Sequence, residues 1–152
     1  DRQALGGNKL KQGDLRKDVR YTGEYEAGIY LWDFIKIKEN IRIYRNDSND
    51  QYYDYYDYYA FRTKTSLVTI FTEKLYSITS FAYTRKLYDD RLSTENSVHQ
   101  KDNFYVFNAS LLYELTPSFT LATGYSYREN TSNEPLEKYS GSICTVGLYY
   151  TF

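Results

Sequence analysis

The sequence has few of the residues on which many active sites and covalent frameworks depend. Its 152 residues include one cysteine, one histidine and two prolines. Cys144 has no second cysteine to pair with, which excludes an intrachain disulfide and a thiolate metal cluster. His99 has no serine or cysteine at a matching position, so we predict a non-enzymatic protein without a cofactor or a metal, and interpret His99 as a solvated loop residue.

Long apolar runs and a strong net charge are also missing. No segment approaches the roughly 20 apolar residues that a transmembrane helix requires. The net charge of −1 gives no electrostatic reason to expect a nucleic acid as partner. The polar stretch that begins at Asp1 is not a signal peptide, so we expect either a processed protein or part of a longer one.

Tyrosine, in contrast, is abundant. There are 20 tyrosines, and aromatic residues make up 19% of the sequence, while mean hydropathy is only −0.69. A transmembrane β-barrel is not visible in a hydropathy profile, because every second residue of each strand faces a polar interior. Tyrosine suits the two membrane interfaces, where its ring contacts lipid and its hydroxyl contacts water.

The clearest strand is predicted at residues 139–152, where apolar and small or polar residues alternate. Counting back by two from Phe152 gives Tyr150, Leu148, Val146 and Cys144. Successive side chains of a strand point to opposite faces, so this row forms one apolar face. A terminal aromatic behind such a row is typical of a lipid-facing strand that ends at the membrane interface. Cys144 lies in this row and is interpreted as a small apolar residue.

Alternation recurs along most of the chain. The pattern predicts seven antiparallel strands, at about residues 21–31, 34–44, 59–71, 75–87, 103–115, 119–127 and 139–152. Residues 1–19 show no such pattern and are interpreted as a polar external loop or tail, in which a weak strand at residues 4–10 stays open. The predicted fold is therefore an all-β, up-and-down transmembrane β-barrel over residues 20–152.

The connections between these strands alternate in length. The turns at residues 32–33, 72–74 and 116–118 are short, and the last of them contains Pro117, which cannot donate to a ladder. The connections at residues 45–57, 88–102 and 128–138 are longer and polar. Tight periplasmic turns and longer external loops are the pattern of an outer-membrane barrel.

One residue conflicts with a lipid-facing exterior. Glu39 falls on the isoleucine face of the second strand, where a charge within the membrane is costly. Three explanations stay open at this point. A bulge resets the register near Glu39, or this face contacts protein, or the strand is not in lipid.

The last two strands resemble a known family. Residues 119–128 (FTLATGYSYR), the loop residues Asn130-Thr131-Ser132-Asn133, Tyr139 and the ending Gly147-Leu148-Tyr149-Tyr150-Thr151-Phe152 look like the closing hairpin of outer-membrane β-barrel porins. The resemblance covers about the last thirty-five residues. It implies a location in the bacterial outer membrane, a channel-like architecture, and recognition of Phe152 and Tyr150 by the barrel-assembly machinery. It implies no particular solute.

The number of strands bears on the kind of barrel. By this resemblance the last strand runs from outside to periplasm, so the strand at residues 21–31 starts outside. Bacterial single-chain barrels have an even number of strands. We therefore expect the C-terminal part of a larger barrel, completed by further strands of the same or another chain. A whole eight-stranded barrel, with residues 4–10 as its first strand, is the alternative.

Charged residues gather on the parity that faces inward. The predicted lumen-lining charges are Glu24, Glu26, Lys36, Lys38, Arg42, Arg62, Lys64 and Glu114. Such side chains either set the ion preference of a pore or pair with one another and keep a polar interior satisfied. Five of the bases lie on two adjacent strands and outnumber the nearby acids, which favours the first interpretation for these five.

Two tracts have simpler interpretations than binding. The run Asn46-Asp47-Ser48-Asn49-Asp50 lacks the glycine and the distal glutamate of a calcium loop and is interpreted as a solvated loop. The tyrosine-rich tract at residues 52–59 is interpreted as an interface girdle rather than as a stacking platform.

Three functions from different classes follow. The first is a porin-like channel for ions or small solutes. The second is a structural barrel that anchors or sheaths a partner, such as a secreted polymer or a redox protein, in the outer membrane. The third is a soluble β-barrel that binds a ligand.

Overall fold

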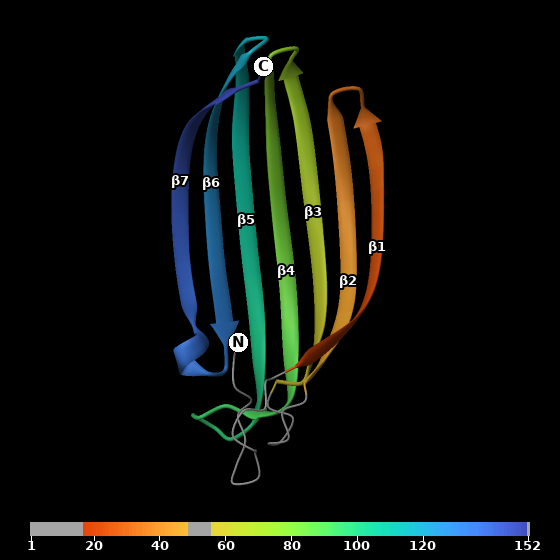
Figure 1. Cartoon of the computed structure of the whole chain (residues 1–152), viewed down its shortest axis with the longest axis vertical. Coiled ribbons are helices and arrows are strands. Elements are labelled where there is room, and N and C mark those ends of the chain that lie inside the picture. The colour runs from red at the N-terminus through yellow and green to blue at the C-terminus, as the bar shows by residue number, and fades with distance from the viewer. Residues whose placement is uncertain (1–16, 49–55, 152) are drawn as a thin grey trace.

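The computed structural model describes residues 17–48 and 56–151, and these form one antiparallel sheet. Each strand pairs with its neighbours in the sequence, as Figure 1 shows. The strands are β1 (Asp18–Trp32), β2 (Ile35–Ser48), β3 (Tyr58–Thr72), β4 (Leu75–Leu92), β5 (His99–Thr116), β6 (Phe119–Ser132) and β7 (Tyr139–Tyr150), with one short 3-10 helix, η1 (Pro135–Glu137), before β7. The predicted all-β class, the seven strands and their up-and-down order are confirmed.

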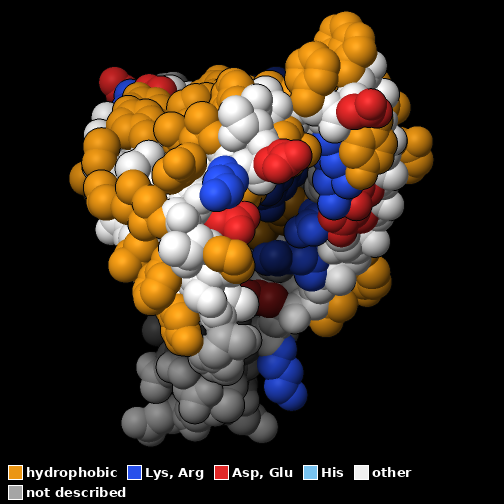
Figure 2. Space-filling view, turned by 90° about the horizontal axis from the view of Figure 1, so that it is seen from above, with side chains coloured by type: hydrophobic (Ala, Val, Ile, Leu, Met, Phe, Trp, Pro, Cys, Tyr) orange, Lys and Arg blue, Asp and Glu red, His pale blue; other side chains and the backbone are white. Residues whose placement is uncertain are grey.

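The pairing register keeps one parity on each face across the whole sheet. From β1 to β6 the even-numbered residues share one face, which is concave, and β7 joins it with its odd-numbered residues because Ser126 pairs with Ile143. The other face is convex. Figure 2 shows hydrophobic side chains over much of the outside, and lysine, arginine, aspartate and glutamate side chains around the hollow. The alternation in the sequence thus divides apolar from charged side chains.

The three short turns lie together at one end, and all three carry a register shift at the end of the preceding strand (Figure 1). Two of them use the same local device. The Thr72 hydroxyl accepts hydrogen bonds from the backbone N–H groups of Lys74 and Leu75, at 3.2 and 3.0 Å. The Thr116 hydroxyl does the same for Ser118 and Phe119, at 3.3 and 3.2 Å. A threonine hydroxyl that bonds the backbone two and three residues ahead closes a turn without further residues.

At the opposite end, called here the long-loop end, the strands extend further than their alternation predicts. β4 continues to Leu92 and β5 begins at His99, so most of the predicted loop at residues 88–102 is strand. β6 likewise continues to Ser132, and β2 continues through Asn46 and Asp47 to Ser48 instead of ending in a solvated loop. Both faces of the sheet are polar at this end. The strands therefore continue beyond the point at which alternation of apolar and polar residues ends, and the sequence pattern does not reveal the added residues.

The described residues contain almost no buried apolar core. Only Tyr58, Ala60 and Ala82 are buried hydrophobic residues, whereas large apolar side chains are exposed on the convex face, for example Ile43 at 59% and Val146 at 77%. In water an apolar patch of this extent marks an interaction surface. The described part of the sheet is therefore stabilised mainly by the hydrogen bonds between its strands and by polar side-chain contacts.

The register also answers part of the question raised by Glu39. Both of its pairings are regular, with Ala27 on one side and Thr65 on the other, so a bulge does not move it and that explanation is wrong. Glu39 stays on the convex face, where its carboxylate accepts hydrogen bonds from the hydroxyls of Thr63 and Thr65. The neighbouring strand thus satisfies both carboxylate oxygens.

The edges of the sheet are β1 and β7, and the sheet of the described residues is not closed. Both edge strands run from the long-loop end to the short-turn end, as seven antiparallel strands require (Figure 1). Direct pairing of β1 with β7 would therefore be parallel, whereas an all-antiparallel closure needs an odd number of additional strands. In the part of the chain that the structure describes, no helix has the length and apolar character needed to cross a membrane.

Candidate functional site on the concave face

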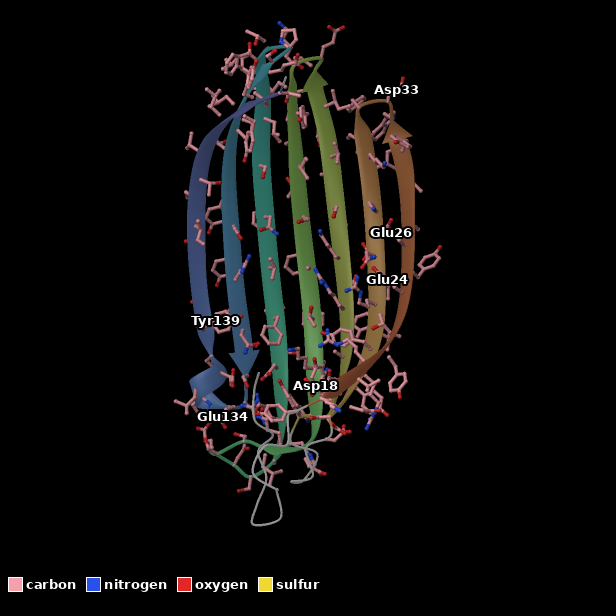
Figure 3. All side chains as sticks on the ribbon, viewed as in Figure 1. Asp18, Glu24, Glu26, Asp33, Glu134 and Tyr139 are labelled. Atoms are coloured by element: carbon pink, nitrogen blue, oxygen red, sulfur yellow. The ribbon has the colours of Figure 1, made fainter. Side chains whose placement is uncertain are left out.

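Six of the eight predicted lumen-lining charges surround one hollow on the concave face. The hollow measures about 220 Å³ and is lined by Glu24, Glu26, Lys38, Asn40, Arg42, Arg62, Lys64 and Ser66. Figure 3 labels Glu24 and Glu26 midway along β1, and the other lining residues come from β2 and β3. Alternation on three consecutive strands places all of these side chains on the same face.

Both acids of the hollow are neutralised by neighbours on β2. Arg42 Nη2 donates to both carboxylate oxygens of Glu24, at 2.8 and 2.9 Å, and Asn40 Nδ2 donates to one of them at 2.7 Å. Lys38 Nζ lies 2.7 Å from a carboxylate oxygen of Glu26. The pairing of these acids with the bases of β2 agrees with the adjacency that the sequence predicts.

The bases of β3 have no such partners. Among the described residues, neither Arg62 nor Lys64 has a carboxylate oxygen within 4.0 Å. Four bases (Lys38, Arg42, Arg62 and Lys64) and two acids line the hollow, which leaves an excess of two positive charges. The hollow is therefore a place where a small anion lowers the electrostatic energy of the protein.

The other two predicted charges lie outside this hollow. Lys36 is on the same face of β2, nearer the short turns, and its Nζ lies 5.0 Å from the centre of the Tyr30 ring. Glu114 lies near the end of β5, where it pairs across the ladder with Thr120. Spacing by two along a strand predicts a face but not the position along the strand at which side chains gather.

The predicted assembly signal is described only in part. Tyr150 lies at the end of β7, and its ring packs against Phe119 with the ring centres 5.0 Å apart. Phe152 lies outside the described residues. Recognition by the barrel-assembly machinery stays a prediction.

A second polar cluster lies at the long-loop end, and it was not predicted from the sequence. Asp102 on β5 is 2% exposed and accepts hydrogen bonds from Gln100 Nε2 at 2.9 Å and from Ser132 Oγ at 2.6 Å. Lys86 on β4 faces Asp102 across the ladder. Asn130 on β6 is equally buried and donates to the carbonyl oxygen of Glu137 at 2.7 Å. The residues around Gln100 and Asp102 are polar at every position, so alternation could not reveal the cluster.

Tyr58 belongs to the same end of the concave face. Its side chain is 8% exposed, and its ring lies against those of Tyr44 and Tyr88, with ring centres 6.0 and 5.4 Å away. Its hydroxyl accepts a hydrogen bond from Arg20 Nη2 at 3.1 Å. The interpretation of this tract as an interface girdle is therefore wrong for Tyr58, whereas Tyr59 lies on the convex face and is 52% exposed.

The loops at this end are tied together by Glu134, labelled in Figure 3. Its carboxylate accepts a hydrogen bond from the backbone N–H of Thr94 at 2.7 Å and another from the Thr94 hydroxyl at 2.9 Å. The backbone bond is the main reason why the pKa of Glu134 is lower than that of an ordinary glutamate. Nearby, Arg91 at the end of β4 and Glu137 in η1 form an ion pair with an N···O distance of 2.9 Å.

This tie predicts a local dependence on pH. A carboxylate whose pKa is lower in the folded protein stabilises it above the unfolded pKa, about 4.3, and that contribution disappears as the pH falls through the folded value. Below about pH 4, hydrogen exchange at the Thr94 amide, corrected for its intrinsic pH dependence, should become faster. Glu134→Ala, which removes both acceptor oxygens, should already show the fast exchange at pH 7. Exposed Glu95, changed to alanine, is the control, and a Thr94 amide equally protected in Glu134→Ala and wild type would contradict the prediction.

The described residues contain no group of three or more histidine, cysteine, aspartate or glutamate side chains placed to hold a metal ion.

The fold defines the class of this protein as an antiparallel up-and-down sheet with an apolar convex face and a charged concave face. Comparison with known protein families, curated proteins and solved structures finds no match.

Proposed function

We propose that this chain is a segment of a transmembrane β-barrel of the bacterial outer membrane, and that the barrel is a porin-like channel for ions or small solutes. The observation that carries the proposal is the distribution of side chains over the two faces. Exposed apolar residues cover the convex face, charged residues line the concave hollow, and only three of the hydrophobic residues in the described ranges 17–48 and 56–151 are buried. This is the reverse of a soluble protein and the arrangement expected of a barrel in lipid.

Strand length supports the same proposal. The strands contain 12 to 18 residues, and a tilted strand needs about 9–11 to cross the hydrocarbon core. The excess residues extend beyond the membrane at the long-loop end, where both faces are polar. The short turns are then periplasmic, and the long loops are external.

The open edges support a larger assembly. β1 and β7 run in the same direction, so an odd number of further strands completes an antiparallel barrel. These strands come from the same chain or from another one. Residues 4–10, the alternative eighth strand, lie outside the described residues. About sixteen strands enclose an aqueous channel, whereas eight leave an interior filled by side chains.

A structural barrel that anchors or sheaths a partner is the second candidate, and the long-loop end favours it. There the concave face carries buried polar side chains, among them Gln100 and Asp102, which are hydrogen-bonded to each other, and Asn130, which donates to the Glu137 carbonyl oxygen. Such packing leaves less room for an open passage. Conductance separates the two candidates, because a filled barrel passes no current.

The experiment measures the current of the full-length protein in planar bilayers. The positive excess in the hollow attracts anions at low salt, and screening removes the attraction as the Debye length falls from about 10 Å at 0.1 M to about 3 Å at 1 M. We expect a modest anion preference in 0.1 M salt that disappears in 1 M salt. Changing Lys36, Lys38 and Lys64 to glutamine should shift the reversal potential toward non-selectivity.

Lys74→Gln in the β3–β4 turn is the matched control, since it removes a positive charge away from the concave face. It should leave the ion preference unchanged. Absence of any current from correctly inserted protein would reject the channel and favour the structural barrel. Stable monomeric protein without detergent would reject the membrane location itself.

A further inference from the structure

Two arginines face each other across the β2–β3 ladder. Arg42 and Arg62 are direct cross-strand partners on the concave face. Side chains in this relation start about 5 Å apart, and like charges in such a pair repel. Of these two arginines, Arg42 has a carboxylate partner, Glu24, whereas Arg62 has none in the described part of the chain. The two adjacent guanidinium groups therefore have one neutralising acid between them. The pair is therefore electrostatically incomplete.

Each of the two arginines has an N–H group, at Nε, that no acceptor engages. Glu24 accepts hydrogen bonds from Nη2 of Arg42, which leaves the Nε–H of Arg42 unengaged. The Nε atoms of Arg42 and Arg62 are both enclosed, and neither has a hydrogen-bond partner. An enclosed donor without an acceptor costs free energy and leaves the positive charge of its guanidinium group less well balanced. Two such groups on paired residues favour a ligand with several acceptor oxygens.

The surroundings fit such a group in charge and in size. The lining of the hollow carries an excess of two positive charges, and Lys64 lies beside Arg62 on the same face. The volume of about 220 Å³ corresponds to roughly seven water molecules at about 30 Å³ each. This space accommodates a phosphate group together with a small organic substituent.

We propose that this hollow binds a phosphate dianion, either free inorganic phosphate or the phosphate group of a small solute, between Arg42 and Arg62. The phosphate oxygens accept hydrogen bonds from the guanidinium groups of the two arginines, and Lys64 adds charge. Guanidinium groups match phosphate oxygens in geometry, and a dianion balances the excess of two charges. As a statement about transport, this rests on the proposed channel, and it makes phosphate-bearing solutes the preferred class. Binding itself does not depend on conduction.

The test is a titration of the full-length protein in detergent with inorganic phosphate at constant ionic strength, followed by calorimetry and by the NMR signals of the arginine Nε–H groups. We expect saturable binding that shifts two of these signals. Arg62→Gln should weaken binding by about tenfold or more, since it removes a charge-assisted donor. Arg62 has no ion pair to lose, so this change should disturb the fold little.

Arg128→Gln is the matched control. Arg128 is exposed on the concave parity of β6, opposite Gly141, so the change removes the same charge from the same face away from the hollow. Phosphate affinity should stay within about twofold of wild type, as expected for a distant screened charge. Equal weakening by both variants would show diffuse attraction and overturn the site.

Two further comparisons complete the test. Arg62→Lys keeps the charge but removes the planar guanidinium group, so it should lower the preference for phosphate over chloride even if Arg62→Gln does not fold. Malonate binding as tightly as phosphate would reassign the site to dicarboxylates and overturn the phosphate proposal. Absence of saturable binding would overturn the site altogether.

Failure of the site and failure of the channel are distinguishable. Phosphate binding without current in planar bilayers would leave the site in place and reject the channel. Current without saturable phosphate binding would leave the channel in place and reject the site. Current reduced by phosphate in wild type, but not in Arg62→Gln, is the result expected if both proposals hold.

Discussion

Replacing Asp102 with alanine is expected to destabilise the protein by about 2–6 kcal/mol. Asp102 is 2% exposed and is the acceptor for Gln100 Nε2 and for Ser132 Oγ. Its removal leaves two enclosed donors without an acceptor, and each such group costs about 1–3 kcal/mol. It also leaves Lys86, which faces Asp102 across the ladder, without this carboxylate.

The measurement is the free energy of unfolding of the protein in lipid vesicles, obtained by denaturant titration. Asp102→Asn is the control, because its amide oxygen still accepts hydrogen bonds at the same position while the charge is lost. It should retain more of the stability than alanine does. An alanine variant within about 0.5 kcal/mol of wild type, the range of ordinary surface changes, would show that the cluster is not structural.

This cluster illustrates what the sequence could not predict. Alternation reveals a strand only where its two faces differ in polarity, as in β2, where isoleucines alternate with lysines and arginines. Around Gln100 and Asp102 both faces are polar, so the pattern is that of a loop although the residues are in β5. Continued pairing there depends on side-chain hydrogen bonds between residues 30 positions apart, such as Ser132 to Asp102.

The concave hollow was predictable to a greater extent. A two-residue turn joins β1 to β2, so the sequence alone places Glu24 and Glu26 beside the bases of β2, and the structure pairs them with Arg42 and Lys38. The position of Arg62 opposite Arg42 depends on the long connection between β2 and β3. A connection of that length does not fix a register, so the facing arginines could not be derived from the sequence.

Whether the sheet closes into a barrel, and with how many strands, also could not be predicted from strand patterns alone. A strand that is apolar on one face and polar on the other fits a barrel of any size. The total number of strands is set by shear and by further strands that local alternation does not reveal. Seven strands with parallel edge directions therefore determine the parity of what completes the sheet, but not its size.

If the convex face lies in lipid as proposed, replacing both Thr63 and Thr65 with valine is expected to destabilise the protein by about 3–6 kcal/mol. Their hydroxyls donate to the two carboxylate oxygens of Glu39 on the convex face. Hydrogen bonds to a charged group contribute about 1.5–3 kcal/mol each. In lipid no water would replace the lost donors, so Glu39 would keep the full cost. The measurement is the free energy of unfolding in lipid vesicles, compared with that of wild type.

Glu39→Leu, added to the valine pair, should restore most of the lost stability, because the carboxylate that needed the hydroxyls is gone. This rescue separates the explanations that remain for Glu39. If the convex face were in water, Glu39 would be hydrated, and the valine pair would cost little with or without leucine. If the face contacted a protein partner through Glu39, leucine would stabilise the isolated barrel but weaken its association with that partner. Rescue without loss of association supports a lipid-facing carboxylate held by two threonines.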